Sequence, residues 1–271
     1  MNNNFFIVIP SYKRSNIIVK KTLHLCCIKY NIPQEQIYIF VLEEDFNDYK
    51  HILDKFNYQN INLISAINDT APGLHNMRNF ITNYFDEDVP LLHIDDDIDD
   101  LYKLHEDISI ENKNKSAHWQ LISLNSNEFI DFINNSFSNL KKHGLSLFGI
   151  YPVKNGFFMK DLPERTYDLR FCVGAFWGCF NKKDIQITLE EKEDFERTIL
   201  FYILSGGVLR NNHITLKTKY YSTKGGMQSR NIDRVLESQK SCAILCEKYP
   251  NFCRLYSSKK NGMCEVRLKN K

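Results

Sequence analysis

The sequence has no long apolar run. Phe5–Ile9 is apolar, but a membrane-spanning helix needs roughly 18–20 such residues, and this run has no basic flank of the kind that precedes a secretory signal core. We therefore expect a protein without membrane contact, located in the cytoplasm or a nucleus.

Net charge is also nearly absent. The chain has 35 Lys and Arg against 33 Asp and Glu, a formal charge of +2. Nucleic-acid-binding domains are often strongly basic, so the composition does not favour one, although local clusters matter more than the sum. There is no internal repeat. The 271 residues, 43% of them hydrophobic, indicate one globular domain.

Disulfides are not indicated in a reducing compartment, so the eight cysteines are expected to be thiols. The simplest interpretation is that they act as small buried hydrophobic residues. A zinc site is the alternative for the last four, but their spacing fits no common short zinc motif. These four are Cys242, Cys246, Cys253 and Cys264.

Apolar runs and helical patterns alternate through the first half, which is typical of βαβ units. The expected strands are Phe5–Ile9, Gln36–Leu42, Ile61–Ser65 and Val89–Ile94. The expected helices are Asn16–Tyr30, Asp48–Phe56 and Gly73–Tyr84. The predicted fold class is α/β, a single Rossmann-like domain with a mostly parallel central sheet flanked by helices.

The second half is less regular. A polar loop is expected over Glu106–His118 and a basic tail after the last helix. The expected helices are Ser126–Gly144, Glu190–Ser205 and Asn231–Tyr249. The expected strands are Leu145–Tyr151, Phe171–Phe180 and Ile214–Tyr221.

An acidic triplet, Asp95, Asp96 and Asp97, directly follows the fourth expected strand. Ligands of open parallel sheets bind beyond the carboxyl ends of the strands. Three carboxylates there repel one another unless a cation relieves them, and Mg²⁺ or Mn²⁺ prefers such oxygen ligands and bridges diphosphates. A solvated turn is the alternative, because Asp99 and Asp100 continue the acidic run.

Two basic segments precede the triplet. The first strand leads into Pro10-Ser11-Tyr12-Lys13-Arg14, where a nucleotide would sit and a cation could attract phosphate. Arg78 follows Gly73 on a helix, and it could bind the diphosphate or brace the triplet. The alternatives are a plain strand-to-helix turn and an arginine on a helix face.

Carboxylates recur near the start of a later helix, in Glu193-Asp194-Phe195-Glu196-Arg197. Asp194 is the candidate general base that would deprotonate an acceptor hydroxyl. The alternative is helix capping, since negative groups are stabilised at a helix N-terminus. If Asp194 is only a cap, Glu193 or Glu196 is the next candidate base.

A Gly-Gly turn with a lysine, Lys224-Gly225-Gly226, follows the last expected strand. Backbone N–H groups of such a turn, together with the lysine, can cradle phosphate. The alternative is an ordinary turn, for which Gly-Gly is common.

The order of these motifs resembles the metal-dependent, nucleotide-sugar glycosyltransferases with one GT-A-type domain. The likeness rests on Ile-Pro-Ser-Tyr-Lys-Arg, Gly-Leu-His-Asn-Met-Arg-Asn, Asp-Asp-Asp after a strand, and Glu-Asp-Phe-Glu, and it spans about residues 5–230. It implies that Asp95 or Asp96 contacts the nucleoside, that Asp97 ligates the metal and that Asp194 is the base of an inverting enzyme. The predicted donor-binding residues are Pro10, Ser11, Tyr12, Arg14, Glu43, Arg78, Asp95, Asp96, Lys224, Gly225 and Gly226.

A narrower resemblance is to the TET-associated DNA glycosyltransferases, which include the base J glucosyltransferases of kinetoplastids and relatives in large DNA viruses and phages. It is carried by Ile-Asp-Asp-Asp-Ile, by Glu-Asp-Phe-Glu-Arg-Thr with a downstream Gly-Gly-Val-Leu-Arg-Asn, and by Lys-Gly-Gly-Met-Gln. This likeness implies a UDP-sugar donor, Mn²⁺ or Mg²⁺, a hydroxymethylated pyrimidine in DNA as acceptor, and a virus-encoded origin. It also implies His213 as a second metal ligand. We expect Trp177 and Glu193 on the acceptor side of the site.

The predicted organisation is a nucleotide-sugar half (1–105), an acceptor-binding and catalytic half (106–230) and a C-terminal helix with its tail (231–271). Three other functions remain open. The chain could glycosylate a glycan, a protein or a small molecule, it could be a nucleotidyltransferase, or it could be an inactive relative that binds a nucleotide sugar or DNA.

Overall fold

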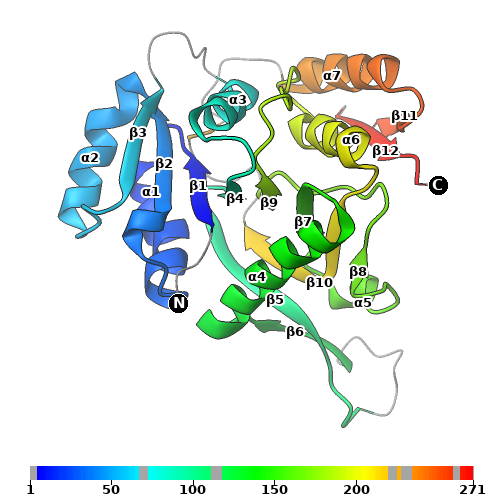
Figure 1. Cartoon of the computed structure of the whole chain (residues 1–271), viewed down its shortest axis with the longest axis horizontal. Helices are drawn as coiled ribbons and strands as arrows, with labels where there is room; N and C mark the ends of the chain where they lie inside the picture. Colours follow the sequence, from blue (N-terminus) through cyan, green and yellow to red (C-terminus); the bar gives the residue numbers. More distant parts are fainter. Residues whose placement is uncertain are drawn as a thin grey trace.

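The computed structural model describes residues 5–66, 73–110, 118–218, 225–226, 234–258 and 263–270 (Figure 1). Its centre is one large sheet with the strand order β3-β2-β1-β4-β9-β7-β10-β5-β6. A further short strand, β8, pairs with β10 and is not part of this linear order. The sheet takes strands from both predicted halves of the chain, and helices lie against it, so the predicted α/β fold is confirmed.

The first four strands form the parallel part of the sheet. β1 pairs with β2 and β4, and β2 pairs with β3, all in parallel. The strands are β1 (Phe6–Pro10), β2 (Ile37–Leu42), β3 (Asn62–Ala66) and β4 (Pro90–Ile94). The helices between them are α1 (Ser15–Lys20), α2 (Phe46–Lys55) and α3 (Leu74–Tyr84). The carboxyl ends of β1 and β4 therefore open on the same edge.

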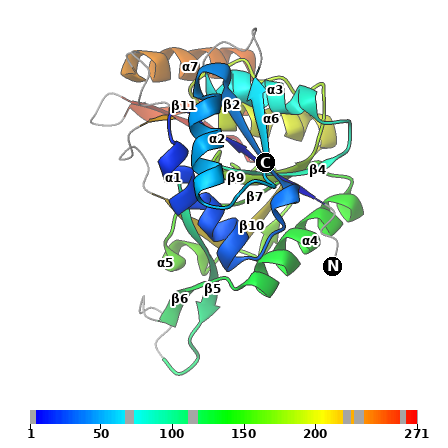
Figure 2. The same ribbon diagram turned by 90° about the vertical axis from the view of Figure 1, so that its left-hand side faces the viewer.

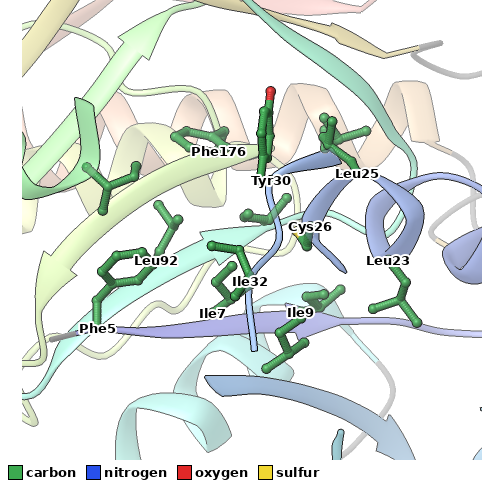
Figure 3. Close-up of a cluster of buried hydrophobic side chains, with 14 of the residues drawn as sticks. Phe5, Ile7, Ile9, Leu23, Leu25, Cys26, Tyr30, Ile32, Leu92 and Phe176 are labelled. Carbon is green, nitrogen blue, oxygen red and sulfur yellow. The ribbon is translucent and has the colours of Figure 1, made fainter. Parts of the chain in front are cut away.

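The β1 strand is apolar throughout because both of its faces are covered. Ile7 and Ile9 pack in the cluster that includes side chains of α1 and α2, while Val8 packs on the other face with Met77 and Ile81 of α3. Figure 3 shows the first cluster, in which Ile7 and Ile9 lie near Leu23 and Leu92.

One predicted helix is divided in two. Asn16–Tyr30 was expected as a single helix, but α1 ends at Lys20 and a π-helical stretch follows at His24–Lys29. Single-turn 3₁₀ segments occur at Gln34–Gln36 and Glu43–Asp45. The second of these forms the turn between β2 and α2.

The second half of the sheet is mixed in direction. β9 (Phe176–Phe180) joins β4 and β7 (Leu147–Tyr151) through antiparallel pairs, and β7 pairs in parallel with β10 (Leu209–Thr218). Antiparallel β5 (Ile98–Glu106) and β6 (Trp119–Ser123) then extend it, and β8 (Arg165–Thr166) pairs with β10. The sequence patterns missed β5 and β6, since β5 is rich in charged residues. They also extended the predicted Phe171–Phe180 strand five residues too far back.

Three helices belong to this half: α4 (Ser126–His143), α5 (Gly156–Met159) and α6 (Glu193–Ser205). α4 begins with a capping box in which Asn125 accepts from the Glu128 backbone N–H while the Glu128 carboxylate accepts from that of Asn125. Figure 2 shows α4 below α6 and the parallel strands. Within the described residues, none of the helices is long and apolar enough to cross a membrane.

The C-terminal region is folded rather than a loose basic tail. α7 (Arg234–Lys248) is followed by the antiparallel pair β11 (Cys253–Ser258) and β12 (Cys264–Leu268). Cys242, Cys253 and Val266 are buried in one apolar cluster with Leu245 and Ile199 of α6. All eight cysteines are free thiols, and no three His, Cys, Asp or Glu side chains of the described residues converge as a metal-binding group, zinc included.

Candidate active site

A cavity of about 550 Å³ opens at the carboxyl ends of β1 and β4 and reaches the start of α6. Most residues that the sequence predicted for the site line it. They are Pro10, Ser11, Tyr12, Arg14, Asp95, Asp96, Asp97, Glu193, Asp194 and Gly226. Lys224 lies outside the described residues. Gly225, Glu43, Arg78, Trp177 and His213 do not line the cavity.

Asp96 fixes the exit of β1. Its carboxylate accepts from Ser11 Oγ at 2.5 Å and from Arg14 Nη1 at 2.8 Å, and its side chain is almost completely buried. Ser11 Oγ also lies 2.6 Å from Tyr49 Oη, which accepts from the Arg14 backbone N–H. Ser11, Arg14 and the acidic triplet are therefore one hydrogen-bonded unit although they are far apart in sequence.

Asp97 lies between β10 and the same arginine. Its Oδ1 accepts from Thr218 Oγ1 at 2.9 Å, and its Oδ2 lies 3.3 Å from Arg14 Nη1. The Gly225–Gly226 turn covers Arg14, and the Gly226 N–H donates to the Tyr12 carbonyl. A Cβ atom on Gly226 would lie 2.8 Å from Arg14 Cζ, and the residue has φ +60°. Both the close approach of Arg14 and the left-handed backbone therefore favour glycine at this position.

Asp95 is the most open member of the triplet, with a side chain 32% exposed. Arg78 Nη2 donates to it at 2.9 Å and to the Gly174 carbonyl at 3.0 Å. Burial raises the pKa of Asp95 to about 7, with Arg78 opposing this and the neighbouring carboxylates adding to it. Arg78, 1% exposed, therefore braces the triplet from beneath.

Trp177 lies under the cavity, in the core. Its ring stacks on His93 of β4 at a centroid distance of 3.6 Å, and the Arg197 guanidinium lies 4.1 Å from its centroid. Arg78 Nη1 lies 3.3 Å from His93 Nδ1. Burial and the two arginines push the pKa of His93 well below its usual value, so the ring is neutral and Nδ1 accepts from Arg78.

Glu193 and Asp194 begin α6 on the opposite wall of the cavity. Arg197, fully buried, donates to Glu193 Oε2 at 3.0 Å and to the Cys172 carbonyl at 2.8 Å. Burial and the Glu193 charge raise the pKa of Asp194 to about 6, against the opposing influence of Arg197. Gly174 fits between the walls because a Cβ there would lie 2.7 Å from Glu193 Oε1. Asp194 can therefore change protonation state near neutral pH, which suits a general base.

Glu196, the other candidate base, faces away from the cavity. It is fully buried and accepts from the backbone N–H groups of Thr188 and Leu189, and from Lys248 Nζ of α7 at 2.8 Å. These bonds tie α6 to α7 and leave no path to a substrate in the cavity.

Two other predicted residues lie elsewhere. Glu43 is exposed at the start of its 3₁₀ turn, and the neighbouring Asp45 is the side chain that accepts from the Lys13 N–H. His213 Nε2 lies 2.9 Å from the Leu162 carbonyl oxygen, and the ring lines a separate hollow. It lies five positions before Thr218 on β10, roughly 17 Å at the usual rise per residue, so the structure does not bring it to Asp97.

Carboxylates dominate the described lining of the cavity. They are Asp95, Asp96, Asp97, Glu190, Glu191, Glu193, Asp194 and Glu265, whereas the basic lining residues are Arg14 and Lys192. Even with the buried Arg78 and Arg197 beneath, negative charge is in excess. Among the residues that the structure describes, a diphosphate would therefore meet more negative than positive side chains, and a bound cation would offset this.

Several residues that line or support the cavity were not identified from the sequence. Thr218 closes the triplet from β10, and Phe171 stacks on Phe195 at a centroid distance of 4.4 Å to form an aromatic wall. Arg197 stands one helical turn after Glu193, a spacing that favours an ion pair and could have indicated it. Thr218 and Phe171 carry no comparable local signal.

No protein-family model matches this chain, and no curated protein matches it in sequence. Among solved structures it is similar to S. aureus TarS in complex with UDP-GlcNAc, at 13% identity over 92% of this chain and 67% of that chain, with a TM-score of 0.54. It also matches the Pyrobaculum calidifontis mannosyltransferase PcManGT in complex with GDP-Man and Mn²⁺, at 9% identity over 76% of this chain and 53% of that one, with a TM-score of 0.47. The chain has the fold of the GT-A-type, nucleotide-sugar-binding glycosyltransferases.

Proposed function

We propose that this chain is a glycosyltransferase that moves a sugar from a nucleotide donor, a UDP-sugar, to a hydroxyl acceptor with inversion. One observation carries the proposal. The acidic triplet after β4 and Asp194 at the start of α6 line opposite walls of the same cavity, which has the volume of a small-molecule site. A donor held on one wall would present its sugar to the other.

The donor side is the wall formed by β1 and β4. Tyr12, Pro10 and Leu42 line it and offer an apolar surface for the nucleoside, while Asp96 and Ser11 supply polar partners for the ribose. Arg14 is the lining cation nearest the triplet and would meet the diphosphate. Arg78 acts through Asp95, and the exposed Glu43 has no part in this assignment.

A divalent cation fits the chemistry of this wall. Mg²⁺ and Mn²⁺ prefer oxygen ligands, and Mg²⁺ is usually held by one or two carboxylates together with substrate phosphates and water. Asp97 and Asp95 are the carboxylates that would hold it, and the diphosphate would complete the set. When bound, the ion would neutralise charge on the departing diphosphate. His213 is too far along β10 to share it.

Asp194 is the base in this proposal. Its carboxylate faces the cavity with a raised pKa, and inversion needs one base on the acceptor side. Glu193 stays beside it, held by Arg197. The stacked Phe171 and Phe195 replace the buried Trp177 as the aromatic surface for the acceptor.

The acceptor we propose is a hydroxymethylated pyrimidine in DNA. This rests on the motif likeness to the TET-associated DNA glycosyltransferases, and the aromatic wall beside Asp194 suits a base taken out of its stack. A glycan, protein or small-molecule acceptor is the rival within the same chemistry.

A donor screen tests the function. Purified chain is incubated with UDP- and GDP-sugars, with Mn²⁺, Mg²⁺ or chelator, and release of nucleoside diphosphate is measured with and without hydroxymethylated DNA. We expect slow release with one donor and faster release when the modified DNA is added. Absence of release with every donor would refute the transferase, while acceleration by another hydroxyl acceptor alone would refute DNA.

A further inference from the structure

Positive charge is concentrated at the C-terminal end of the chain. Residues 253–271 contain six of the 35 Lys and Arg and one of the 33 Asp and Glu, which gives this segment a formal charge of +5 and leaves −3 on the remainder. The near-neutral total therefore conceals a charge asymmetry that the net value of +2 does not reveal.

Two of these basic residues, Arg254 and Arg267, lie on one exposed face of the β11–β12 pair. Arg254 lies directly opposite Arg267 in the antiparallel register, and both side chains are exposed. Tyr256 is 60% exposed, and the Arg267 guanidinium lies 5.4 Å from its ring centroid. We call Arg254, Tyr256 and Arg267 the basic strand face. Like charges directly opposite each other destabilise a strand pair, and bound phosphate would remove that cost.

The basic strand face is firmly attached and adjoins the cavity. Cys253 and Val266 are buried against Leu245 of α7 and Ile199 of α6, so the strand pair is anchored to the helix that carries Asp194. Glu265 and Val266 also line the cavity. In Figure 1, β11 and β12 lie beside α6 and α7. A long acceptor that lies along Arg267 would therefore pass the wall of the cavity that carries Asp194.

We propose that the basic strand face binds the sugar–phosphate backbone of a nucleic-acid acceptor while one of its bases enters the cavity. This rests on the proposed function and adds the surface that would hold the acceptor. Guanidinium groups bind phosphates, and an exposed tyrosine beside an arginine is a stacking platform for a base. The aromatic ring favours a nucleic acid over a polyanion without bases.

The test uses the full chain and labelled hydroxymethylated DNA, as a duplex and as a single strand, with binding measured by fluorescence anisotropy between about 50 and 200 mM salt. Removing two phosphate contacts in Arg254→Gln/Arg267→Gln should reduce the slope of log affinity against log salt by roughly 1.8 for the duplex. The matched control, Lys50→Gln/Lys55→Gln on exposed positions of α2, should leave the slope unchanged. α2 lies on the far side of the molecule in Figure 1.

Tyr256→Ala tests the aromatic part. Loss of one stacked base should weaken single-strand binding by roughly 5- to 100-fold. Polyphosphate that competes as well as DNA, together with unchanged binding by Tyr256→Ala, would overturn the nucleic-acid assignment.

An equal salt slope in the arginine variant and in the α2 control would refute the proposal that the basic strand face binds DNA. A wild-type chain that does not bind DNA would also refute it. Release of nucleoside diphosphate without acceptor should be the same in all variants. A chain that binds DNA through these arginines but hydrolyses no donor would refute the proposed function and leave this inference standing.

Discussion

Replacing Glu193 by Gln removes one negative charge beside Asp194 and preserves the size of the side chain. A Cβ on Gly174 would lie 2.7 Å from Glu193 Oε1 and 3.7 Å from Asp194 Oδ2, so the two oxygens are at most about 6.4 Å apart, the sum of those distances. Two like charges about 6 Å apart repel by about 3 kcal/mol at an effective dielectric of about 20, which corresponds to roughly two pKa units.

Burial is the larger cause of the raised pKa of Asp194 and the Glu193 charge is the second, so removing that charge reverses only part of the rise. We therefore expect Glu193→Gln to lower the pKa of Asp194 by about one unit from its value of about 6. A base acts when it is deprotonated, so activity falls as the pH drops through this pKa. The acidic limb of the rate profile should move from about pH 6 to about pH 5, and the ionised fraction at pH 5 should rise roughly fivefold.

The assay is release of nucleoside diphosphate against pH at saturating donor. Glu196→Gln is the matched control, since that carboxylate lies on the same helix but faces α7. It should leave the limb near pH 6 in protein that remains folded. A limb that stays at pH 6 in Glu193→Gln would show that the two carboxylates are not coupled as described. If the rate instead falls off near pH 7, and Glu193→Gln does not shift that limb, the titrating group is Asp95.

Four further outcomes are expected. Asp194→Asn should cut turnover by roughly 10²–10⁴-fold with nearly unchanged donor affinity, and near-normal turnover would reduce Asp194 to a helix cap. Asp97→Ala should abolish cation-dependent activity, on the order of 10²-fold or more, whereas full wild-type turnover in excess chelator would contradict the cation requirement. Arg78→Ala should weaken donor binding. It should also lower the free energy of unfolding by about 3–5 kcal/mol, because it leaves the Asp95 carboxylate without its buried partner. An unchanged midpoint of denaturant unfolding would contradict this. Because its pKa is raised to about 7, Asp95 stabilises the folded state fully below the ordinary Asp value of 3.8 and no longer above pH 7, so the melting temperature should fall between about pH 4 and 7, and less so in Asp95→Asn.

Local sequence determined the donor half of the fold. Apolar runs such as Phe5–Ile9, covered on both faces, specify buried parallel strands, and the helices between them follow from apolar periodicity. Because parallel strands share one orientation, residues after β1 and β4 had to meet at one edge. That rule predicts that Ser11, Arg14 and the acidic triplet lie close together, and the hydrogen bonds of Asp96 with Ser11 and Arg14 agree with it.

Only the tertiary structure decided what each side chain faces. Glu193, Asp194 and Glu196 share one helix turn in the sequence, yet Glu196 bonds to Lys248 while the other two line the cavity. Trp177 could not be assigned to core or surface from its strand, because the ring that covers it, His93, is far away in the chain.

The strands that close the second half were equally hidden. β5 carries charged residues along most of its length, so it lacks the alternation that predicts a strand, and it is held in place by pairing with β10. That pairing also brings Thr218 to Asp97 and leaves His213 in the middle of β10, where it contacts the Leu162 carbonyl. Strand register depends on contacts between residues more than 100 positions apart, and a local pattern contains no information about them.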